Sequence, residues 1–558
     1  YFIELTFAPP GNPVKVEELL LKLPLRGDSE TMLAFGAGGK TSGFLSKEKG
    51  RIWKSSDRQA KIMTVGTFVP VIWVGDDRNG LFWVADNDKG WVPSDEHEAS
   101  ELYREEDDSL TLVHNLIKDP NGFTIDKSRT ISFWIMPTPV VPYQSDWRQA
   151  SKNPGGCSGC FSRGGSFEQS HRMDPETKIN GWMWYHPETT NPDPATWEKY
   201  YRKMRYSNDW EQKKICFAST WGVQSGMKKE IAYFRSEWGE GEYTPSLIDH
   251  YIWLFDKYVR DGDLDYIYED VMNIDAYKTL SSETAYYLPD GRIQPGFVIT
   301  ARREHNKRLY AVFVEAGKRP WIGGNNIALL PVTSFMTMYL TGDDNISAGS
   351  KYDFGDLRTP GFLRSRVIPE IMGGVQRPFF TYGKGNWRTI RGHLALHNIF
   401  GDSTSNSFMT IMGIENIYTR GDLSKFHAYW RNQEYVKVNV AGMKEDEIKC
   451  SILQQTADDP DGTDLHIFVF NYNKEKEAHG VVTIDLKKMI RGATELKHME
   501  DISIPNAKWG PGSPARAVKE YVPQFKFSPR LDAAKGLLVI DDLSIPKRDF
   551  AEIHLRVK

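Results

Sequence analysis

Residues 264–270 read LDYIYED, a short run of large apolar residues that ends in two adjacent carboxylates. The run predicts a buried β-strand that delivers acids at its carboxyl end. Residues 334–344 repeat the pattern, because SFMTMYL is followed by TGDD. Strands that present acids in this way, with helical patterns between them, are typical of a (β/α) barrel enzyme. The two segments therefore predict carboxylate chemistry at one end of a central barrel.

Strand and helix patterns alternate through the middle of the chain. Residues 179–185 and 214–219 have strand patterns, and residues 246–259 and 300–315 place apolar side chains at helical spacing. This alternation favours a parallel sheet, and the number of units suits a (β/α)8-type barrel over residues 139–415.

The regions on either side are rich in strand patterns. Residues 68–75 and 80–86 flank a turn of Asp, Asn and Gly and predict a hairpin. We therefore expect an N-terminal β-sandwich over residues 1–138, and we expect it to be a truncated one that lacks its first strands. The stiff segment PTPVVP at 137–142 marks the boundary to the barrel. Alternation at 465–472 and 481–486 predicts a C-terminal β-sandwich over residues 416–558. The predicted fold class is multidomain α/β plus all-β.

Composition excludes some partner classes. The 558 residues carry a net charge of −4, with Lys and Arg scattered among Asp and Glu, which argues against nucleic acid as a partner. No apolar run has the length of a membrane span, so we expect no membrane partner. The chain starts at Tyr1 without a signal-peptide pattern, and we expect that targeting information has been removed. Aromatic residues make up 13% of the chain, which fits either β-rich cores or a groove that stacks on sugars.

Cysteine and acidic clusters give little support for a metal site. Cys157 and Cys160 form a lone C-x-x-C, which favours a loop disulfide or two free thiols over zinc, while Cys216 and Cys450 lie in apolar strand patterns and are expected in cores. Three Asp-rich segments, 76–77, 86–88 and 459–461, are typical of surface turns, with structural calcium as the alternative.

Four segments carry a resemblance to a known family. The longest is WVGDDRNGLFWVADNDKGW at 73–91, which is similar to the N-terminal sandwich signature of bacterial glycoside-hydrolase-like proteins. These proteins are related to the retaining β-N-acetylgalactosaminidases of glycoside hydrolase family 123. IYED at 267–270 resembles the end of a barrel strand in the family. REHNKRLY at 303–310 resembles the helix that follows, and LTGD at 340–343 resembles a later strand end. The resemblance covers nearly the whole chain and implies a sandwich, a barrel and a sandwich in this order.

The resemblance and the strand ends together select the catalytic candidates. Asp270 occupies the family's matching position, Glu269 is its alternate, and Asp343 is the expected partner carboxylate. One acid would protonate the glycosidic oxygen, and the other would act as nucleophile, as base for water, or as the group that orients a substrate acetamide. The order Glu269-Asp270 departs from the family's Asp-then-Glu pair, and Asp343 stands where the family has Glu. Ion pairs, helix caps and turn chemistry are the competing structural roles.

Further polar and aromatic residues near predicted strand ends are candidates for substrate binding, although core packing competes for each. They are Tyr268, Asp344, Asn325, His186, Trp184 and Trp221.

The leading hypothesis is a glycoside hydrolase that acts on a carbohydrate substrate without an organic cofactor and, because it handles polysaccharide, is secreted or periplasmic. A polysaccharide lyase that recruits Tyr268, His186 and Arg303 is one alternative. A non-catalytic glycan-binding protein on a barrel scaffold is the other. The sequence does not give the oligomeric state.

Overall fold

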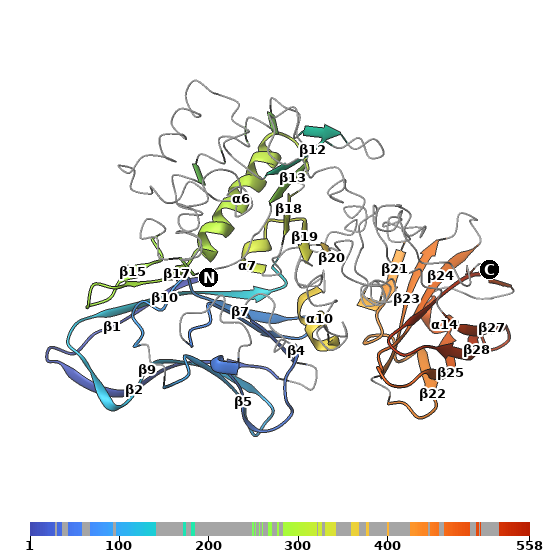
Figure 1. Ribbon diagram of the computed structural model, residues 1–558, viewed down its shortest axis with the longest axis horizontal. Coiled ribbons are helices and arrows are strands. Elements are labelled where there is room, and N and C mark those ends of the chain that lie inside the picture. Colours follow the sequence, from blue (N-terminus) through green and yellow to red (C-terminus); the bar gives the residue numbers. More distant parts are fainter. Residues whose placement is uncertain are drawn as a thin grey trace. The chain divides into compact units, whose positions relative to one another are not determined.

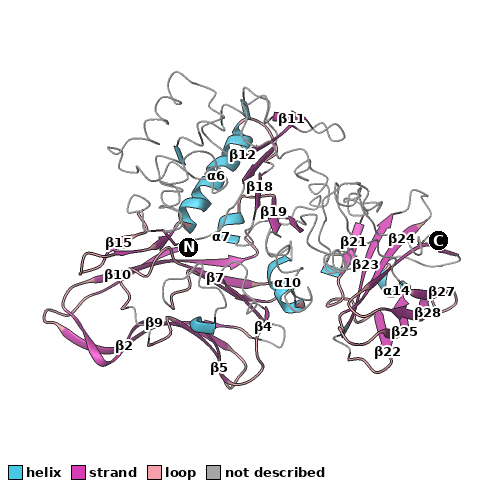
Figure 2. Cartoon of the chain, viewed as in Figure 1, coloured by secondary structure: helices cyan, strands magenta, loops and turns pink. Residues whose placement is uncertain are grey.

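In the computed structural model, the described residues form mainly β-sheets with few helices (Figures 1 and 2). It describes residues 1–27, 31–35, 43–57, 67–92, 96–140, 171–173, 180–184, 248–249, 252, 256, 259–260, 266–269, 276–277, 283–320, 322–325, 330–341, 359–367, 375–378, 399–400, 424–444, 447–456, 462–490, 498–501, 503 and 524–558. The chain divides into two compact units. The first unit contains residues 1–143, 157–340 and 360–374, and the second contains residues 144–156, 341–359 and 375–558.

The N-terminal part of the first unit is a pair of antiparallel sheets. One sheet, called sheet A here, has the order β1 (Phe2–Phe7), β10 (Arg129–Thr138), β7 (Gly80–Val84), β6 (Val71–Gly75), β3 (Met32–Phe35) and β4 (Gly43–Phe44). The other has the order β2 (Val14–Leu25), β9 (Leu110–Ile125), β8 (Ser100–Arg104) and β5 (Gly50–Lys54). The predicted hairpin is confirmed, since β6 and β7 pair antiparallel from Val71↔Val84 to Gly75↔Gly80.

Aromatic side chains fill the space between these sheets. The ring of Trp83 on β7 stacks on His114 of β9 with centroids 4.1 Å apart, and Trp91 packs against both rings. Because side chains alternate along a strand, the neighbours of Trp83 on β7 face the opposite, outer side of sheet A. This outer face includes Trp134, which lies opposite Val84 in the register of β10 and β7.

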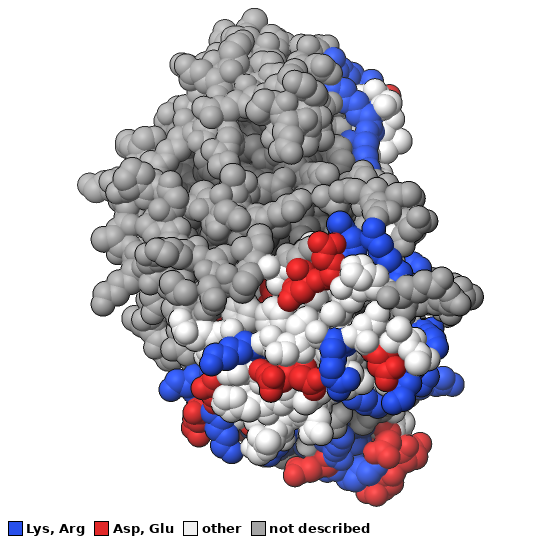
Figure 3. Space-filling model, turned by 90° about the vertical axis from the view of Figure 1, so that its right-hand side faces the viewer, with Lys and Arg blue, Asp and Glu red and all other residues white. Residues whose placement is uncertain are grey.

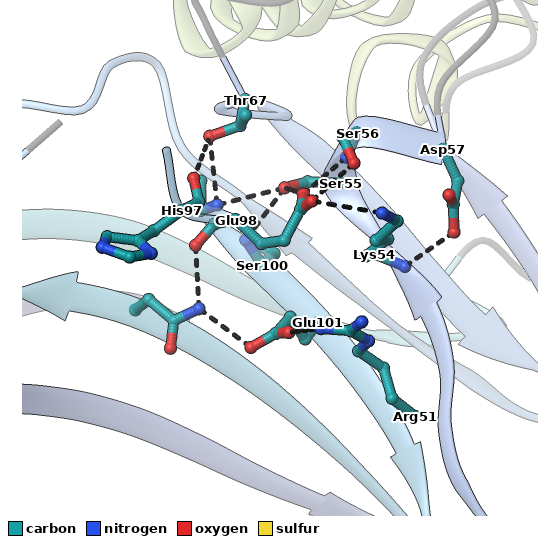
Figure 4. A network of polar contacts seen from close by, with 12 residues as sticks. Arg51, Lys54, Ser55, Ser56, Asp57, Thr67, His97, Glu98, Ser100 and Glu101 are labelled. Atoms are coloured by element: carbon teal, nitrogen blue, oxygen red, sulfur yellow. Dashed lines mark hydrogen bonds and ion pairs between the residues drawn. The ribbon is translucent and has the colours of Figure 1, made fainter. Parts of the chain in front are cut away.

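A polar network holds the segment before β8 against β5 and the short helix η1 (Ser55–Asp57) (Figure 4). The Glu98 carboxylate accepts the backbone N–H of Ser56 at 2.7 Å and the hydroxyl of Ser55 at 3.1 Å. Three residues further on, in β8, Glu101 is 2% exposed and accepts hydrogen bonds from Arg51 Nη1 at 2.7 Å and Asn115 Nδ2 at 3.1 Å. The network therefore satisfies carboxylates that would be costly to bury alone.

Strands and helices alternate in the central part of the first unit. Strands β11 (His171–Met173), β12 (Asn180–Trp184), β13 (Tyr266–Glu269), β18 (Ile322–Asn325) and β19 (Met338–Thr341) are neighbours in this order. β12, β13, β18 and β19 run parallel. The helix α6 (Ile299–Glu315) lies between β13 and β18 in the sequence, and α7 (Leu330–Thr333) lies between β18 and β19. This arrangement agrees with the predicted alternation around residues 264–341.

Three predicted elements can be compared directly with the structure. The opening segment forms β13, and the predicted helix at 300–315 forms α6. The predicted strand at 334–340 is wrong in its start, because β19 begins only at Met338. A turn precedes the strand, because the N–H of Met336 donates to the carbonyl of Thr333 at 2.9 Å. Thr337 then bonds to Ile322 through its backbone N–H at 2.9 Å and its Oγ1 at 3.0 Å.

Short elements complete the first unit. They are the paired strands β14 (Ala276–Tyr277) and β17 (Gly296–Phe297), the paired strands β15 (Tyr286–Tyr287) and β16 (Ile293–Gln294), and the helix α10 (Pro360–Val367). α10 packs closely on the N-terminal sheet, where the backbone of Gly361 lies beside Phe44 and leaves no room for a Cβ atom.

The second unit contains a β-sandwich. One sheet has the order β21 (Ser424–His427), β23 (Ile448–Thr456), β24 (Thr463–Asn471), β29 (Phe550–Val557) and β26 (Met499–Asp501). The other has the order β22 (Val436–Val440), β25 (Ala478–Asp485), β28 (Leu537–Ile545) and β27 (Lys526–Asp532), and α14 (Leu486–Met489) follows β25. One apolar cluster takes side chains from both sheets. Cys450 lies buried in this cluster as expected, and burial raises the pKa of its thiol to about 12.

The described surface mixes charges of both signs, as Figure 3 shows for one face. This agrees with the scattered Lys, Arg, Asp and Glu of the sequence. Among the described residues, none of the helices combines the length and the apolar character that crossing a membrane requires.

Candidate functional site

The carboxyl ends of four parallel strands lie in a row. Trp184 at the end of β12 is in register with Glu269 at the end of β13, and Glu269 is in register with Gly324 of β18. Gly324 pairs in turn with Tyr339 of β19. We call this row the carboxyl-end edge. Ligands of parallel α/β sheets bind at such an edge, because the loops that leave it converge there.

The structure brings part of the predicted site to this edge. Tyr268 and Glu269 are the last two residues of β13, Trp184 is the last residue of β12, and Asn325 is the last residue of β18. The other predicted site residues lie outside the described residues; they are Asp270, Asp343, Asp344, His186 and Trp221. In the sequence Asp270 comes one residue after the end of β13, and Asp343 comes two residues after the end of β19.

The segment that carried the longest resemblance performs a structural task at the start of α6. Asp86, in the loop after β7, accepts the backbone N–H of Thr300 at 3.1 Å. The N-cap residue of α6 is Val298, whose side chain makes no capping hydrogen bond. Asp86 therefore supplies the cap from a distant part of the chain. Burial raises the pKa of Asp86 to about 6, although the hydrogen bonds from Thr300 and Ile299 oppose this.

The next two residues of the loop hold the β15–β16 hairpin and its flank. Asn87 Nδ2 donates to the carbonyl of Thr284 at 2.8 Å. Asp88 accepts hydrogen bonds from the Tyr286 hydroxyl at 2.8 Å and from Gln294 Nε2 at 2.9 Å. Burial raises the pKa of Asp88, and both hydrogen bonds act against this rise. We call Asp86, Asn87 and Asp88 the clamp, because they fasten the sandwich loop to the elements around residues 284–300.

The clamp also bears on the proposed calcium sites. Both oxygens of Asp88 already accept protein hydrogen bonds. Asp76 Oδ1 accepts the N–H groups of Arg78 and Asn79, both at 2.7 Å, which is the geometry of a turn. The segment 459–461 lies outside the described residues. Within the described part of the chain, no group of three or more His, Cys, Asp or Glu side chains could hold a metal ion.

A pocket of about 650 Å³ lies beside the clamp, between the outer face of sheet A and α6. Phe2, Glu4 and Trp134 contribute the sheet wall, and Glu304 and Arg308 contribute the helix wall. The rings of Phe2 and Trp134 pack together with centroids 5.0 Å apart. Trp134 Nε1 donates to Thr300 Oγ1 at 3.1 Å, so the indole is fixed to the first turn of α6. The pocket thus combines a held aromatic surface with polar side chains.

Sequence reasoning missed this pocket. Phe2 and Trp134 are separated by 132 positions, and only the register of β1 and β10, which pairs Phe2 with Trp134, brings them together. The polar run at 86–89 was the available signal, because a cluster of polar residues between two strongly apolar strands requires partners. The sequence does not show that those partners lie at 284–300.

The lyase alternative can be compared with the position of Arg303. Its guanidinium lies 5.0 Å above the centroid of the Phe335 ring, and burial lowers the pKa of the side chain. This packing gives Arg303 a structural contact between α6 and the segment before β19.

No protein-family model matches the sequence, and a comparison with curated proteins found no significant match. Among solved structures, the chain is similar to the cycloalternan-degrading enzyme from Trueperella pyogenes in complex with a covalent intermediate, with a TM-score of 0.30 and 10% identity over 69% of this chain and 58% of that chain. It is similar to a mutant of Kfla1895 in complex with isomaltose, with a TM-score of 0.31 and 11% identity over 72% of this chain and 64% of that chain.

A further similar structure is the GH36 alpha-galactosidase AgaA from Geobacillus stearothermophilus in complex with raffinose. The TM-score is 0.36 and the identity 10%, over 100% of this chain and 79% of that chain. The chain spans less than two thirds of the length of the cycloalternan-degrading enzyme and of Kfla1895. At these identities and TM-scores, the similarities do not assign the chain to a family.

Proposed function

We propose that this protein is a glycoside hydrolase whose active site forms at the carboxyl-end edge of a (β/α)8-type barrel over residues 139–415. The single observation that carries the proposal is the register of β12, β13, β18 and β19, which aligns their carboxyl ends. Acidic residues follow two of these ends in the sequence, Asp270 directly after β13 and Asp343 two residues after β19. This is the placement that paired-carboxylate chemistry on a barrel requires.

The strand order favours two carboxylates that flank one bound sugar. β18 lies between β13 and β19, and neighbouring strands are about 4.8 Å apart, so the two strand ends are separated by roughly 10 Å. Two side chains that lean toward each other from this separation fit the carboxyl distances of about 5–9.5 Å that glycosidases use. We assign Asp270 as the acid that protonates the glycosidic oxygen and Asp343 as its partner, with Glu269 as the alternate acid.

The substrate class rests on the resemblance to relatives of the β-N-acetylgalactosaminidases and on the residues around the edge. Aromatic side chains can stack on sugar rings, while amides, imidazoles and carboxylates bind hydroxyls. The proposed binding residues are Tyr268, Trp184, Asn325, His186, Asp344 and Trp221. The proposed reaction uses no organic cofactor, and a polysaccharide substrate favours a secreted or periplasmic protein.

The test is a screen of the purified protein against a broad glycan panel, with new reducing ends and ultraviolet absorbance measured together. Asp270→Asn and Asp343→Asn should each lower turnover at least 100-fold, because each removes one of two acid–base groups. Asp107→Asn, which changes an exposed carboxylate in a turn of the sandwich, is the matched control and should retain full activity. Circular dichroism of all variants shows whether the fold is kept.

Three results would contradict the proposal. A gain in ultraviolet absorbance would indicate an unsaturated product and a lyase. Turnover that survives in both Asp270→Asn and Asp343→Asn would remove the edge as the active site. Glycan retention without turnover by the unaltered protein would indicate a binding protein.

A further inference from the structure

None of the predicted active-site residues lines the pocket between sheet A and α6. Its volume of about 650 Å³ falls in the range of small-molecule sites. Its lining comes from β1, β10, the clamp loop, α6 and residues near 248 and 283, so chain segments far apart in sequence converge on it. A site built in this way has a fixed shape, because the clamp and the Trp134–Thr300 hydrogen bond hold its walls.

One wall presents an aromatic surface. Phe2 and Trp134 lie opposite each other in the register of β1 and β10 and therefore share the outer face of sheet A. Phe2 is 52% exposed, which is unusual for a large aromatic side chain. Exposed aromatic rings that are fixed in orientation can stack on the apolar C–H faces of sugar rings.

Acidic and basic side chains surround this aromatic surface. Glu4 accepts a hydrogen bond from the Ser132 hydroxyl at 3.3 Å and is otherwise exposed, so the carboxylate has further capacity to accept. Glu283 is exposed on another side of the pocket and has a positive φ of 63°. On the helix wall, Arg308 donates to Asp249 at 2.7 Å. Because Arg308 is paired with Asp249, the carboxylates of Glu4 and Glu283 remain as acceptors beside the aromatic surface, which suits the hydroxyl groups of a polyhydroxylated ligand.

We infer that this pocket is a second saccharide-binding site, in which Phe2 and Trp134 stack on a sugar ring and Glu4 and Glu283 accept its hydroxyl groups. The class of ligand rests on the proposed function. The site would hold a further part of a long substrate or keep the protein on a polysaccharide.

The experiment measures binding separately from turnover. Asp270→Asn protein is titrated with a panel of methyl monoglycosides and disaccharides, and contact is detected by saturation-transfer NMR and quantified by calorimetry. Phe2→Ala should weaken binding threefold to tenfold and Glu283→Gln should weaken it by a similar factor, because each removes one stacking or hydrogen-bonding partner. Tyr287→Ala is the matched control, since Tyr287 is 63% exposed but does not line the pocket; binding should be unchanged.

The outcomes separate this inference from the proposed function. Binding that is equal in Phe2→Ala, Glu283→Gln and the control, or absent across the panel, overturns the inference, whether or not the unaltered protein hydrolyses glycans. Binding that is lost in the two pocket variants supports it even where no hydrolysis is detected. Binding that falls steeply between 50 and 500 mM salt overturns it as well, because ion pairing rather than stacking would then hold the ligand.

Discussion

Asp86 and Thr300 are 214 positions apart, yet the carboxylate of Asp86 accepts the backbone N–H of Thr300 at 3.1 Å and caps the first turn of α6. A helix usually takes its cap from the residue that precedes its first turn, but here that residue is Val298. The loop after β7 replaces it. The helix that follows β13 is therefore set by the N-terminal sandwich, which explains why the sandwich segment at 86–88 is polar.

The first prediction concerns the pH dependence of this cap. Folding raises the pKa of Asp86 from 3.8 to about 6, so its contribution to the free energy of unfolding is fully present below pH 3.8 and is lost as the pH rises through about 6. Asp86→Asn keeps an acceptor for the Thr300 N–H but cannot ionise. A pKa shift of one unit corresponds to about 1.4 kcal/mol. Asp86 lines the pocket, and screening by solvent there reduces this energy. Between pH 4 and pH 7, we expect the free energy of unfolding of Asp86→Asn to rise by about 1–2 kcal/mol relative to that of the unaltered protein.

Hydrogen exchange of the α6 amides at both pH values measures this change as a free energy of local opening. Asp76→Asn is the control, because Asp76 also accepts backbone N–H groups with Oδ1 but does so in the β6–β7 turn. An equal pH response in the unaltered protein and in Asp86→Asn would contradict the assignment.

The second prediction concerns the Tyr286–Asp88 hydrogen bond of the clamp. Asp88 is 4% exposed and accepts the Tyr286 hydroxyl at 2.8 Å. Tyr286→Phe removes this donor and leaves a buried carboxylate with one partner fewer, which costs about 1.5–3 kcal/mol. Hydrogen exchange of the β15–β16 hairpin should show the loss. Tyr287→Phe removes a hydroxyl from the neighbouring, exposed position and should change exchange by less than about 0.5 kcal/mol; equal effects of the two variants would refute a special role for Tyr286.

The third prediction concerns Glu101. Burial raises the pKa of this carboxyl, but the hydrogen bonds from Arg51 and Asn115 and the charge of Lys118 outweigh it and hold the pKa below its usual value. Its stabilising contribution is therefore present at neutral pH and is lost as the pH falls through the folded pKa, below about 4.5. Glu101→Gln should lower the free energy of unfolding of the sandwich by about 1–3 kcal/mol at pH 7.

The free energy of unfolding is measured in urea, with hydrogen exchange of the β8 and β9 amides as the readout. Glu105→Gln is the control, since Glu105 is exposed and its side chain lies in the turn after β8. If Glu101→Gln proved as stable as this control at pH 7, the network in Figure 4 would not stabilise the sheet.

Local patterns predicted the strands and α6 because burial on one face leaves a period in the sequence. The β6–β7 hairpin was indicated by two apolar runs that flank a turn of Asp, Asn and Gly, and α6 by apolar residues at spacings of three to four. The late start of β19 was not predictable in this way. It depends on the turn that follows α7, in which the N–H of Met336 donates to the carbonyl of Thr333, and the run SFMTMYL continues through this turn.

Contacts between distant segments were also beyond the sequence. The strand ends of the candidate active site could be located, because an acid after an apolar run is a local signal. The pairing of Asp86 with Thr300, and of Phe2 with Trp134, follows from tertiary register alone. Sequence reasoning consequently treated the residues at 86–88 as a surface turn with calcium as the alternative, and it did not show that they bond to Thr284, Tyr286 and Thr300.

The fourth prediction concerns His114, the buried imidazole of the N-terminal core. It stacks on Trp83, and its Nδ1 lies 2.9 Å from the Ser100 hydroxyl; its Nε2 has no hydrogen-bond partner among the described residues. Burial lowers the pKa of His114 from 6.5 to about 3. The unfolded chain therefore takes up a proton between these values that the folded chain excludes, and the free energy of unfolding falls as the pH falls below 6.5. This change of the free energy of unfolding with pH has the opposite sign to the change that Asp86 causes.

Between pH 6.5 and pH 5 this linkage amounts to about 2 kcal/mol. His114→Gln keeps a polar side chain that can pair with Ser100 but does not titrate, so it should be less stable than the unaltered protein at pH 7 and should lose about 2 kcal/mol less on acidification to pH 5. Exchange of the β9 amides at the two pH values gives both quantities. His97, which lies in the segment before β8, provides the control variant His97→Gln. Parallel pH responses of His114→Gln and the unaltered protein would show that the pKa of His114 is the same in the folded and unfolded chain, which would contradict the lowered pKa.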